Sequence, residues 1–158
     1  MISKSSVVLF DGVCLFCEGW VNFVINHNSD QHNIVFVPLQ FVTPREKTKK
    51  KLDAKGGGDS IFCITNNEIL YLKSDASLKA MRHLREPYGI GARILFHIPS
   101  FFRNWVYDLI GRNRYNIWGK KDVCTLPTGD RAKYFGKNVN DLPDDIRITF
   151  SKYFTFIQ

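Results

Sequence analysis

The sequence predicts an α/β protein with a mixed four-stranded sheet, flanking helices and a helical C-terminal extension. Residues 7–10 and 34–39 are continuous apolar runs, which are typical of buried parallel strands. Between them, residues 14–26 carry apolar side chains at helical spacing, on a face broad enough to lie against a sheet. Because a strand, a helix and a strand in this order form a right-handed crossover, we expect the two strands to be parallel.

The strands that follow complete the predicted sheet. Residues 60–65 and 68–72 are two short strand sequences around Asn66-Asn67, which is a good hairpin turn. Three glycines at residues 56–58 are expected to end the helix that precedes this hairpin.

Two helices are expected on either side of the hairpin. The helix before the hairpin is basic and is expected to be exposed. Thr43 is expected to cap this helix, Pro44 to occupy its first position and Glu46 to complete a capping box. After the hairpin, Ser74-Asp75 is expected to cap the next helix.

The last third of the chain differs in character from the rest. Pro99 is expected to restart a helix that reaches about Ile110 and has a broad apolar face: Phe101, Phe102, Trp105, Val106, Leu109 and Ile110. We expect this face to pack on the domain; docking on a membrane surface or in a partner groove is the alternative. Residues 1–90 are expected to form the core, and residues 91–158 a helical and irregular extension packed on the same domain.

Composition limits the function classes. With 158 residues, 44% of them hydrophobic, the chain can bury a real core. No stretch reaches the ~18 apolar residues of a membrane span, and the N-terminus lacks a signal-peptide layout. Four cysteines without a secretory signal indicate a reducing compartment, so we expect a cytoplasmic protein. The net charge of +7 permits nucleic acid, anionic membrane or acidic protein as partner, but it favours a solvated basic surface. No specific nucleic acid is expected.

The chemistry is predicted to lie directly after the first strand, where an Asp11-Gly12 turn precedes Cys14 and Cys17. The first turn of a helix has unpaired N–H groups and the positive end of the helix dipole, which favour a thiolate. A spacing of three residues brings both sulfurs to one face, close enough for a disulfide. We expect Cys14, nearer the helix start and less covered, to be the attacking thiol and Cys17 the resolving thiol.

Two other interpretations of the Cys14 and Cys17 pair remain open. The pair could be half of a zinc site, but Cys63 and Cys124 are single and far apart, and the four histidines show no metal-binding spacing. The pair could also be two inert core residues. We predict that Cys63 and Cys124 are not redox partners of the pair, and that no metal or other cofactor is bound.

Asp11 raises an electrostatic question, because it lies three residues before the proposed nucleophile. A bare carboxylate at ~6 Å would repel the thiolate by about 2.8 kcal/mol at an effective dielectric near 20. That is roughly two pKa units, more than the ~0.3–1 kcal/mol that a helix end supplies. We therefore expect Asp11 to be hydrogen-bonded or paired, with Arg114 as a candidate cation. Asp11 would either cap the turn or relay a proton to or from Cys17.

The sequence resembles the DCC family of predicted thiol-disulfide oxidoreductases, which is named for one aspartate and two cysteines. The resemblance covers about residues 5–130 and includes Asp11, Cys14 and Cys17, then segments 36–40, 59–61, 74–76, 114–119 and 124–127. It implies a thioredoxin-like fold and a dithiol exchange activity. Thioredoxins place a cis-proline near the position of Asp59-Ser60, where this chain has none.

The resulting functional hypothesis is a thiol-disulfide oxidoreductase that acts on a protein or small-molecule disulfide and is reset by an external reductant. The alternatives are a non-catalytic thioredoxin-like module that binds a partner through its basic, aromatic C-terminal third, and a metal-binding protein using Cys14 and Cys17. Contact with a membrane surface or a membrane protein also remains open.

Overall fold

The computed structural model describes residues 4–30, 32–56, 60–67 and 69–157, and has the predicted mixed sheet at its centre. Strand β1 (Lys4–Phe10) pairs in parallel with β2 (His32–Pro38) and antiparallel with β4 (Phe62–Thr65). Strand β5 (Leu70–Leu72) pairs antiparallel with β4 at the edge. The strand order β2-β1-β4-β5 with these directions is that of a thioredoxin-like sheet, so the predicted fold class is confirmed.

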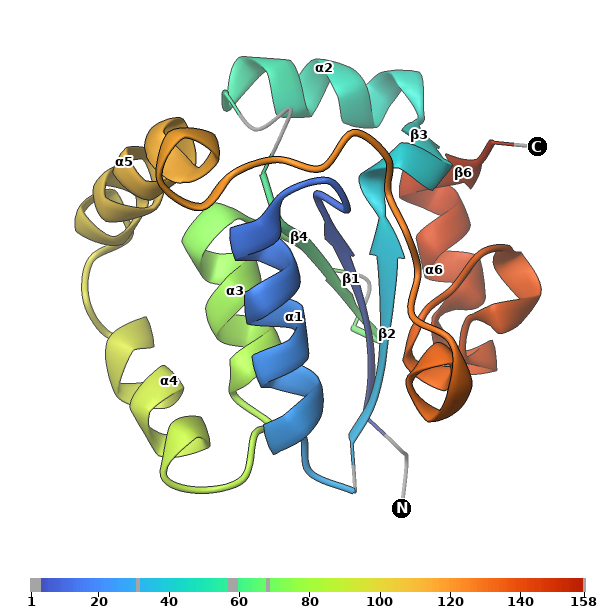
Figure 1. Cartoon of the computed structure of the whole chain (residues 1–158), viewed down its shortest axis with the longest axis horizontal. Coiled ribbons are helices and arrows are strands. Elements are labelled where there is room, and N and C mark those ends of the chain that lie inside the picture. The colour runs from blue at the N-terminus through green and yellow to red at the C-terminus, as the bar shows by residue number, and fades with distance from the viewer. Residues whose placement is uncertain (1–3, 31, 57–59, 68, 158) are drawn as a thin grey trace.

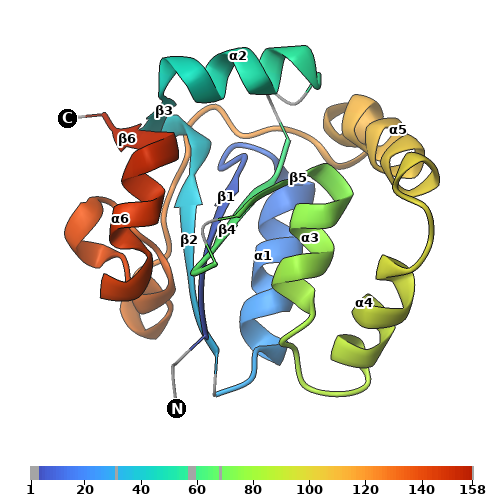
Figure 2. The same cartoon turned by 180° about the vertical axis from the view of Figure 1, so that it is seen from behind.

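Helices cover both faces of this sheet (Figures 1 and 2). Helix α1 (Leu15–His27) is the crossover between β1 and β2 and lies on one face beside α3 (Lys73–Met81). Helix α6 (Asp144–Tyr153) lies on the opposite face against β1 and β4.

The remaining elements frame this layered core. Helix α4 (Tyr88–Phe96) and helix α5 (Ser100–Trp118) lie outside α1 and α3, farther from the sheet (Figure 1). Helix α2 (Glu46–Ala54) crosses one end of the sheet. Strands β3 (Val42–Pro44) and β6 (Phe154–Phe156) form a separate two-stranded sheet. Three short 3-10 turns complete the elements: η1 (Leu39–Phe41), η2 (Gly129–Tyr134) and η3 (Val139–Asp141).

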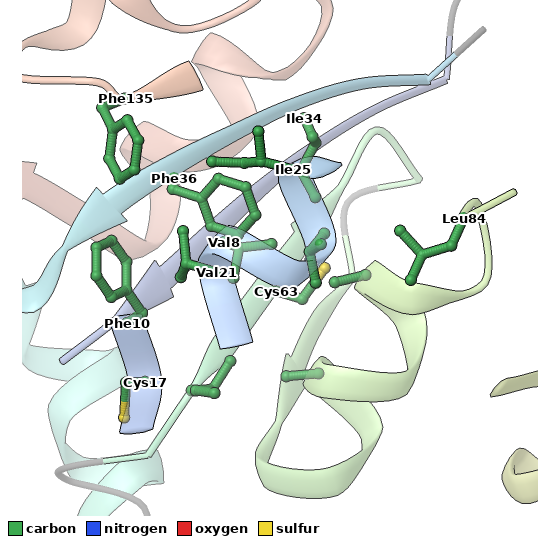
Figure 3. Packing of buried hydrophobic residues seen from close by; sticks show 14 of the residues in the cluster. Val8, Phe10, Cys17, Val21, Ile25, Ile34, Phe36, Cys63, Leu84 and Phe135 are labelled. Carbon is green, nitrogen blue, oxygen red and sulfur yellow. The ribbon is translucent and has the colours of Figure 1, made fainter. Parts of the chain in front are cut away.

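The core has two halves because strand side chains alternate between the two faces. Val8 and Phe10 of β1 point toward α1, whereas Val7 and Leu9 pack with α6. Figure 3 shows the first half, where Phe10 and its neighbours on β2 meet residues of α1 such as Val21. At about 25 cal/mol per Å² of buried apolar surface, these two clusters are the main stabilising contribution.

Two predicted helix starts are wrong because tertiary partners compete with local capping. Thr43 and Pro44 lie in β3, paired with β6 from the C-terminus, so α2 begins at Glu46 with no side-chain cap at Arg45. Helix α3 begins at Lys73, before the predicted cap Ser74-Asp75. The predictions that involve Gly57, Gly58, Asp59 and Glu68 lie outside the described residues.

The prediction for the C-terminal helix is wrong in its length and its orientation. Helix α5 continues past Ile110 to Trp118 and ends where Gly119 takes a φ of 93°, a conformation that glycine adopts without strain. The apolar face that was expected to pack on the domain is largely exposed; Phe101, for example, is 65% exposed. Within the described residues, no helix is both long and apolar enough to cross a bilayer.

Candidate functional site

The dithiol lies where β1 ends and α1 begins, as the sequence predicted. Cys14 is the N-cap residue of α1, and its Sγ accepts the backbone N–H of Cys17 at 3.3 Å. The Cys14 carbonyl accepts the first helical N–H, from Glu18, at 3.0 Å. One of the otherwise unpaired N–H groups at the helix start is therefore directed at the sulfur.

This arrangement separates the pKa values of the two thiols. Hydrogen bonding from Cys17, helped by the positive charge of Arg114, lowers the pKa of Cys14 to about 6 despite its burial. The hydrogen bond to Cys14 and burial raise the pKa of Cys17 well above its usual range. Cys14 is therefore the thiol that ionises near neutral pH, and Cys17 holds a proton.

Asp11 is buried at the end of β1 and makes four polar contacts. Its Oδ1 accepts the Val13 N–H at 3.2 Å and the Gln40 side-chain amide at 2.9 Å. Its Oδ2 lies 3.2 Å from Arg114 Nη2 and accepts the Tyr115 hydroxyl. The expectation that Asp11 is hydrogen-bonded or paired is confirmed, and Arg114 is its cation.

The ion pair resolves the electrostatic question that Asp11 raised. Both partners are buried, with 6% of the Asp11 side chain and 8% of the Arg114 side chain exposed. Arg114 lowers the pKa of Cys14 more than Asp11 raises it. The carboxylate therefore holds the guanidinium in place without imposing a net repulsion on the thiolate.

The chain that follows α5 covers the dithiol. Lys121 donates its backbone N–H to Val13 O at 2.7 Å, and Lys120 forms a β-bridge with Cys14. This segment crosses over the start of α1 in Figure 1. Cys14 has 0% of its surface exposed and Cys17 has 2%, so the expectation that Cys14 is less covered is wrong. In this conformation the Cys14 sulfur is closed to solvent.

The other two cysteines differ in their distance from this turn. Cys63 lies within β4, paired with Val8 of β1, and burial raises its pKa to about 12. Cys124 lies against the turn, since a Cβ built on Gly12 would be 2.3 Å from its Sγ. Burial also raises the pKa of the Cys124 thiol. The close approach of the Cys124 sulfur to the turn explains why residue 12 is glycine. That Cys124 has no redox role stays a prediction.

The region where thioredoxins carry their cis-proline is occupied differently here. Ile61, at the start of β4, donates its backbone N–H to Tyr107 Oη of α5 at 2.8 Å. The cis peptide described in this chain precedes Pro87, at the start of α4. A cavity of about 460 Å³ opens beside Asp11, with Gln40 and Tyr115 in its wall. Neither Cys14 nor Cys17 is among the residues that line this cavity.

The described part of the chain contains no cluster of potential metal ligands. There, no three His, Cys, Asp or Glu residues come together in a group that could hold a metal ion. The absence of zinc therefore stays a prediction for elemental analysis.

Sequence reasoning placed the dithiol and Asp11 correctly but missed part of their surroundings. Gln40 bonds both the Gly12 N–H, at 3.0 Å, and the Asp11 carboxylate. Tyr115 shares Asp11 Oδ2 with Arg114. Both Gln40 and Tyr115 lie in segments that carried the family resemblance, and this was the only signal for them.

A thioredoxin-like sheet with a Cys-x-x-Cys at the start of the first crossover helix defines the thioredoxin-like class of dithiol proteins. Within that class, residues 8–120 match the family described as DCC1-like thiol-disulfide oxidoreductase, and the chain belongs to this family.

Two relatives extend the similarity over most of the chain. The uncharacterized protein YuxK of Bacillus subtilis is 39% identical over 129 residues, which cover 82% of this chain and 92% of YuxK. A chloroplastic DCC family protein of Arabidopsis thaliana is 36% identical over 126 residues, which cover 78% of this chain and 70% of the plant protein. No solved structure matches the chain.

Proposed function

We propose that the protein is a thiol-disulfide oxidoreductase in which Cys14 is the nucleophile and Cys17 the resolving thiol. The observation that carries this proposal is the position of Cys14, at the N-cap of α1 with its sulfur accepting the Cys17 N–H. Its pKa of about 6 makes most of this thiol ionised at neutral pH, and the thiolate is the attacking form.

The proposed reaction balances as a two-electron exchange. The Cys14 thiolate attacks one sulfur of a substrate disulfide, forms a mixed disulfide and releases the other substrate sulfur as a thiolate. Cys17 then loses its proton and attacks Cys14 Sγ, which forms the Cys14–Cys17 disulfide and releases the second substrate sulfur. The substrate is reduced to two thiols, and an external dithiol reductant returns the protein to its reduced form.

In this scheme Arg114 is a positioning residue, whereas Asp11 both holds Arg114 and takes part in proton transfer. Arg114 supports the Cys14 thiolate by its charge, and Asp11 holds the guanidinium through the ion pair at 3.2 Å. Because the Cys17 pKa is raised, its deprotonation needs a base. Asp11 is our candidate for relaying that proton.

A redox titration tests the proposal. The reduced protein is equilibrated in glutathione or dithiothreitol buffers of graded poise and alkylated, and the Cys14–Cys17 disulfide is quantified by mass. We expect a midpoint near the cytosolic glutathione poise, about −220 to −260 mV. The Cys63→Ala protein should give the same midpoint, and the Cys14→Ser protein should form no such disulfide.

The same samples separate the alternatives. If Cys14 and Cys17 form no disulfide at any poise, the exchange activity is excluded and a non-catalytic binding module takes its place. Elemental analysis of the unchelated protein addresses metal binding, for which we expect well under one equivalent of zinc. A stoichiometric metal that is lost in the Cys14→Ser and Cys17→Ser proteins would make metal binding the function.

A further inference from the structure

Helix α5 directs polar side chains toward the protein, which is the reverse of an ordinary surface helix. Arg103 Nη1 lies 2.6 Å from Asp75 Oδ1 of α3, and Tyr107 accepts a backbone N–H at 2.8 Å. Arg114 pairs with Asp11. At about 100° per residue, Arg103, Tyr107 and Arg114 follow one line along the helix. Ion pairs and hydrogen bonds therefore hold this side of α5 to the domain.

The opposite side of α5 is apolar and points away from the domain. Trp105 is 66% exposed, and it lies half a turn from the inner line of the helix. We call this surface the outer face. It consists of exposed apolar residues of α4, of the connection to α5 and of α5 itself: Ile94, Leu95, Ile98, Phe101, Phe102, Trp105, Val106 and Leu109.

The outer face is continuous across the two helices. A groove of about 340 Å³ runs between α3, α4 and α5, and Leu95, Ile98, Phe102 and Val106 line it. Both helices lie at the periphery of the molecule, outside α1 and α3 (Figures 1 and 2). Soluble monomers rarely expose a contiguous apolar surface of this kind without a binding role.

The charges near the outer face are mostly paired. Residues 88–121 contain six Lys or Arg residues, of which Arg93, Arg103, Arg114 and Lys121 pair with carboxylates, and one acidic residue, Asp108, which pairs with Lys73. Arg112 is exposed and follows Trp105 by about two helical turns, so it lies on the same side of α5. In the described part of the chain, neither Arg112 nor Lys120 forms an ion pair. Lys120 lies on the Asp11 side of α5, but Arg112 shares a cavity wall with Gly56, which directly follows the exposed Lys55. Arg112 and the C-terminal end of the basic helix α2 therefore place positive charge at the border of the apolar surface.

We propose that the outer face docks on the surface of a lipid bilayer that contains anionic lipids. Large aliphatic and aromatic side chains on one side of a helix, with cations at the border, are the features that place a helix in the bilayer interface. Phe101 and Trp105, which are 65% and 66% exposed, are the side chains that would enter the headgroup region.

The same charges argue against a second copy of the chain as the occupant. A symmetric dimer through this surface would bring two copies of the same positive border together, and the one carboxylate of residues 88–121, Asp108, already pairs with Lys73. A bilayer with anionic headgroups supplies the opposite charge over the whole surface.

The test is flotation of the full chain with two kinds of vesicle, phosphatidylcholine alone and phosphatidylcholine mixed with phosphatidylglycerol. We expect binding to the mixed vesicles that weakens with added salt. The double variant Phe101→Ser, Trp105→Ser should bind at least about tenfold more weakly, because two exposed apolar anchors are lost. Arg112→Glu should weaken binding to the mixed vesicles about threefold or more.

The matched control is Ile148→Ser, which removes a residue that is 75% exposed on α6, across the sheet. It should leave binding within about twofold of wild type. Three results would overturn the proposal: no binding to either vesicle, equal binding to both, or a wild-type dimer that the double variant converts to a monomer. The assay reads no turnover, so its outcome is independent of thiol exchange.

Discussion

Cys14 and Cys63 are the same residue type and are both closed to solvent, yet their environments give their thiols opposite pKa shifts. Both have 0% of their surface exposed. Cys14 lies at the start of a helix, where hydrogen bonding from Cys17 and the charge of Arg114 lower its pKa to about 6. Cys63 lies inside β4, where burial raises its pKa to about 12.

The difference shows that hydrogen-bond donors and charges near the sulfur compete with burial: at Cys14 the donors prevail, whereas at Cys63 burial outweighs the hydrogen bond with Ser6 and the charge of Lys79. The N–H groups of a strand are used by its neighbours in the sheet, whereas the first N–H groups of a helix remain available. Figure 3 shows Cys17 near Phe10 at the start of α1 and Cys63 farther along the sheet, so one hydrophobic core contains both environments.

The largest expected effect is the difference in alkylation between Cys14 and Cys63. At neutral pH the two pKa values correspond to an about 10⁵-fold difference in thiolate fraction. Because alkylation needs the thiolate, its rate at Cys14 should rise with pH and reach half its plateau near pH 6. Peptide mass mapping after limiting iodoacetamide measures both sites. If the alkylation rate of Cys14 reached half its plateau only above about pH 8, the Cys14 pKa would not be lowered and the proposed difference from Cys63 would be contradicted.

Replacing the nucleophile should have the next largest effect. Cys14→Ser should lower disulfide exchange at least about a thousandfold, because no other ionised thiol takes its place. Cys17→Ser should instead accumulate mixed disulfides through Cys14, visible on non-reducing gels and by mass. Cys63→Ala is the matched control and should keep exchange within about twofold. Mixed disulfides through Cys17 in the Cys14→Ser protein would reverse the assigned roles.

Removing the charge of Arg114 should raise the pKa of Cys14 toward that of Cys63. Arg114→Met should raise the Cys14 pKa by about one unit and slow exchange below neutral pH up to about tenfold. It should also cost about 3–5 kcal/mol of unfolding free energy, because Asp11 stays buried without its cation. Arg93→Met, which breaks the half-exposed pair with Glu86, should cost less than about 1 kcal/mol. An unchanged Cys14 pKa in Arg114→Met would exclude the role of the guanidinium.

Asp11→Asn should have a smaller effect, because it preserves shape and removes the negative charge. We expect exchange to slow about threefold to tenfold, while the Cys14 pKa falls by less than about one unit. The pH dependence of alkylation measures the pKa, and stopped-flow exchange measures the rate. A fall of about two units would show that the carboxylate repels the thiolate despite Arg114.

Cys124→Ser should have the smallest effect. Although its sulfur lies against Gly12, we expect exchange within about twofold of wild type, because the Cys124 thiol has a raised pKa and stays protonated. Turnover and circular dichroism are measured together. A folded Cys124→Ser protein without turnover would make Cys124 a third redox residue.

The parts of the site that the sequence predicted depend on local signals. An apolar strand, an Asp11-Gly12 turn and Cys14 at a helix start follow one another within a few residues, so their geometry is largely set by the backbone there. The pairing of Asp11 with Arg114 was anticipated from charge alone, because a carboxylate beside a reactive thiolate needs a cation.

The orientation of α5 could not be predicted from the same kind of signal. Helical periodicity identifies an apolar side and a polar side, but it does not say which one faces the domain. That choice depends on distant partners such as Asp75, which pairs with Arg103. The cover over Cys14 likewise depends on a bond between Lys121 and Val13, which are far apart in the chain.

The cover over Cys14 has a consequence for oxidative damage. A thiolate with a pKa of about 6 is the form that peroxides convert to sulfenic and then sulfinic acid, the second of which most cells cannot reverse. With 0% of Cys14 exposed, this chemistry requires a local opening of the protein around the sulfur. Burial therefore lowers the rates of oxidation and of alkylation by the same factor, the fraction of time that the site is open. A covered thiolate is thus expected to be lost to sulfinic acid more slowly than an exposed thiolate of the same pKa.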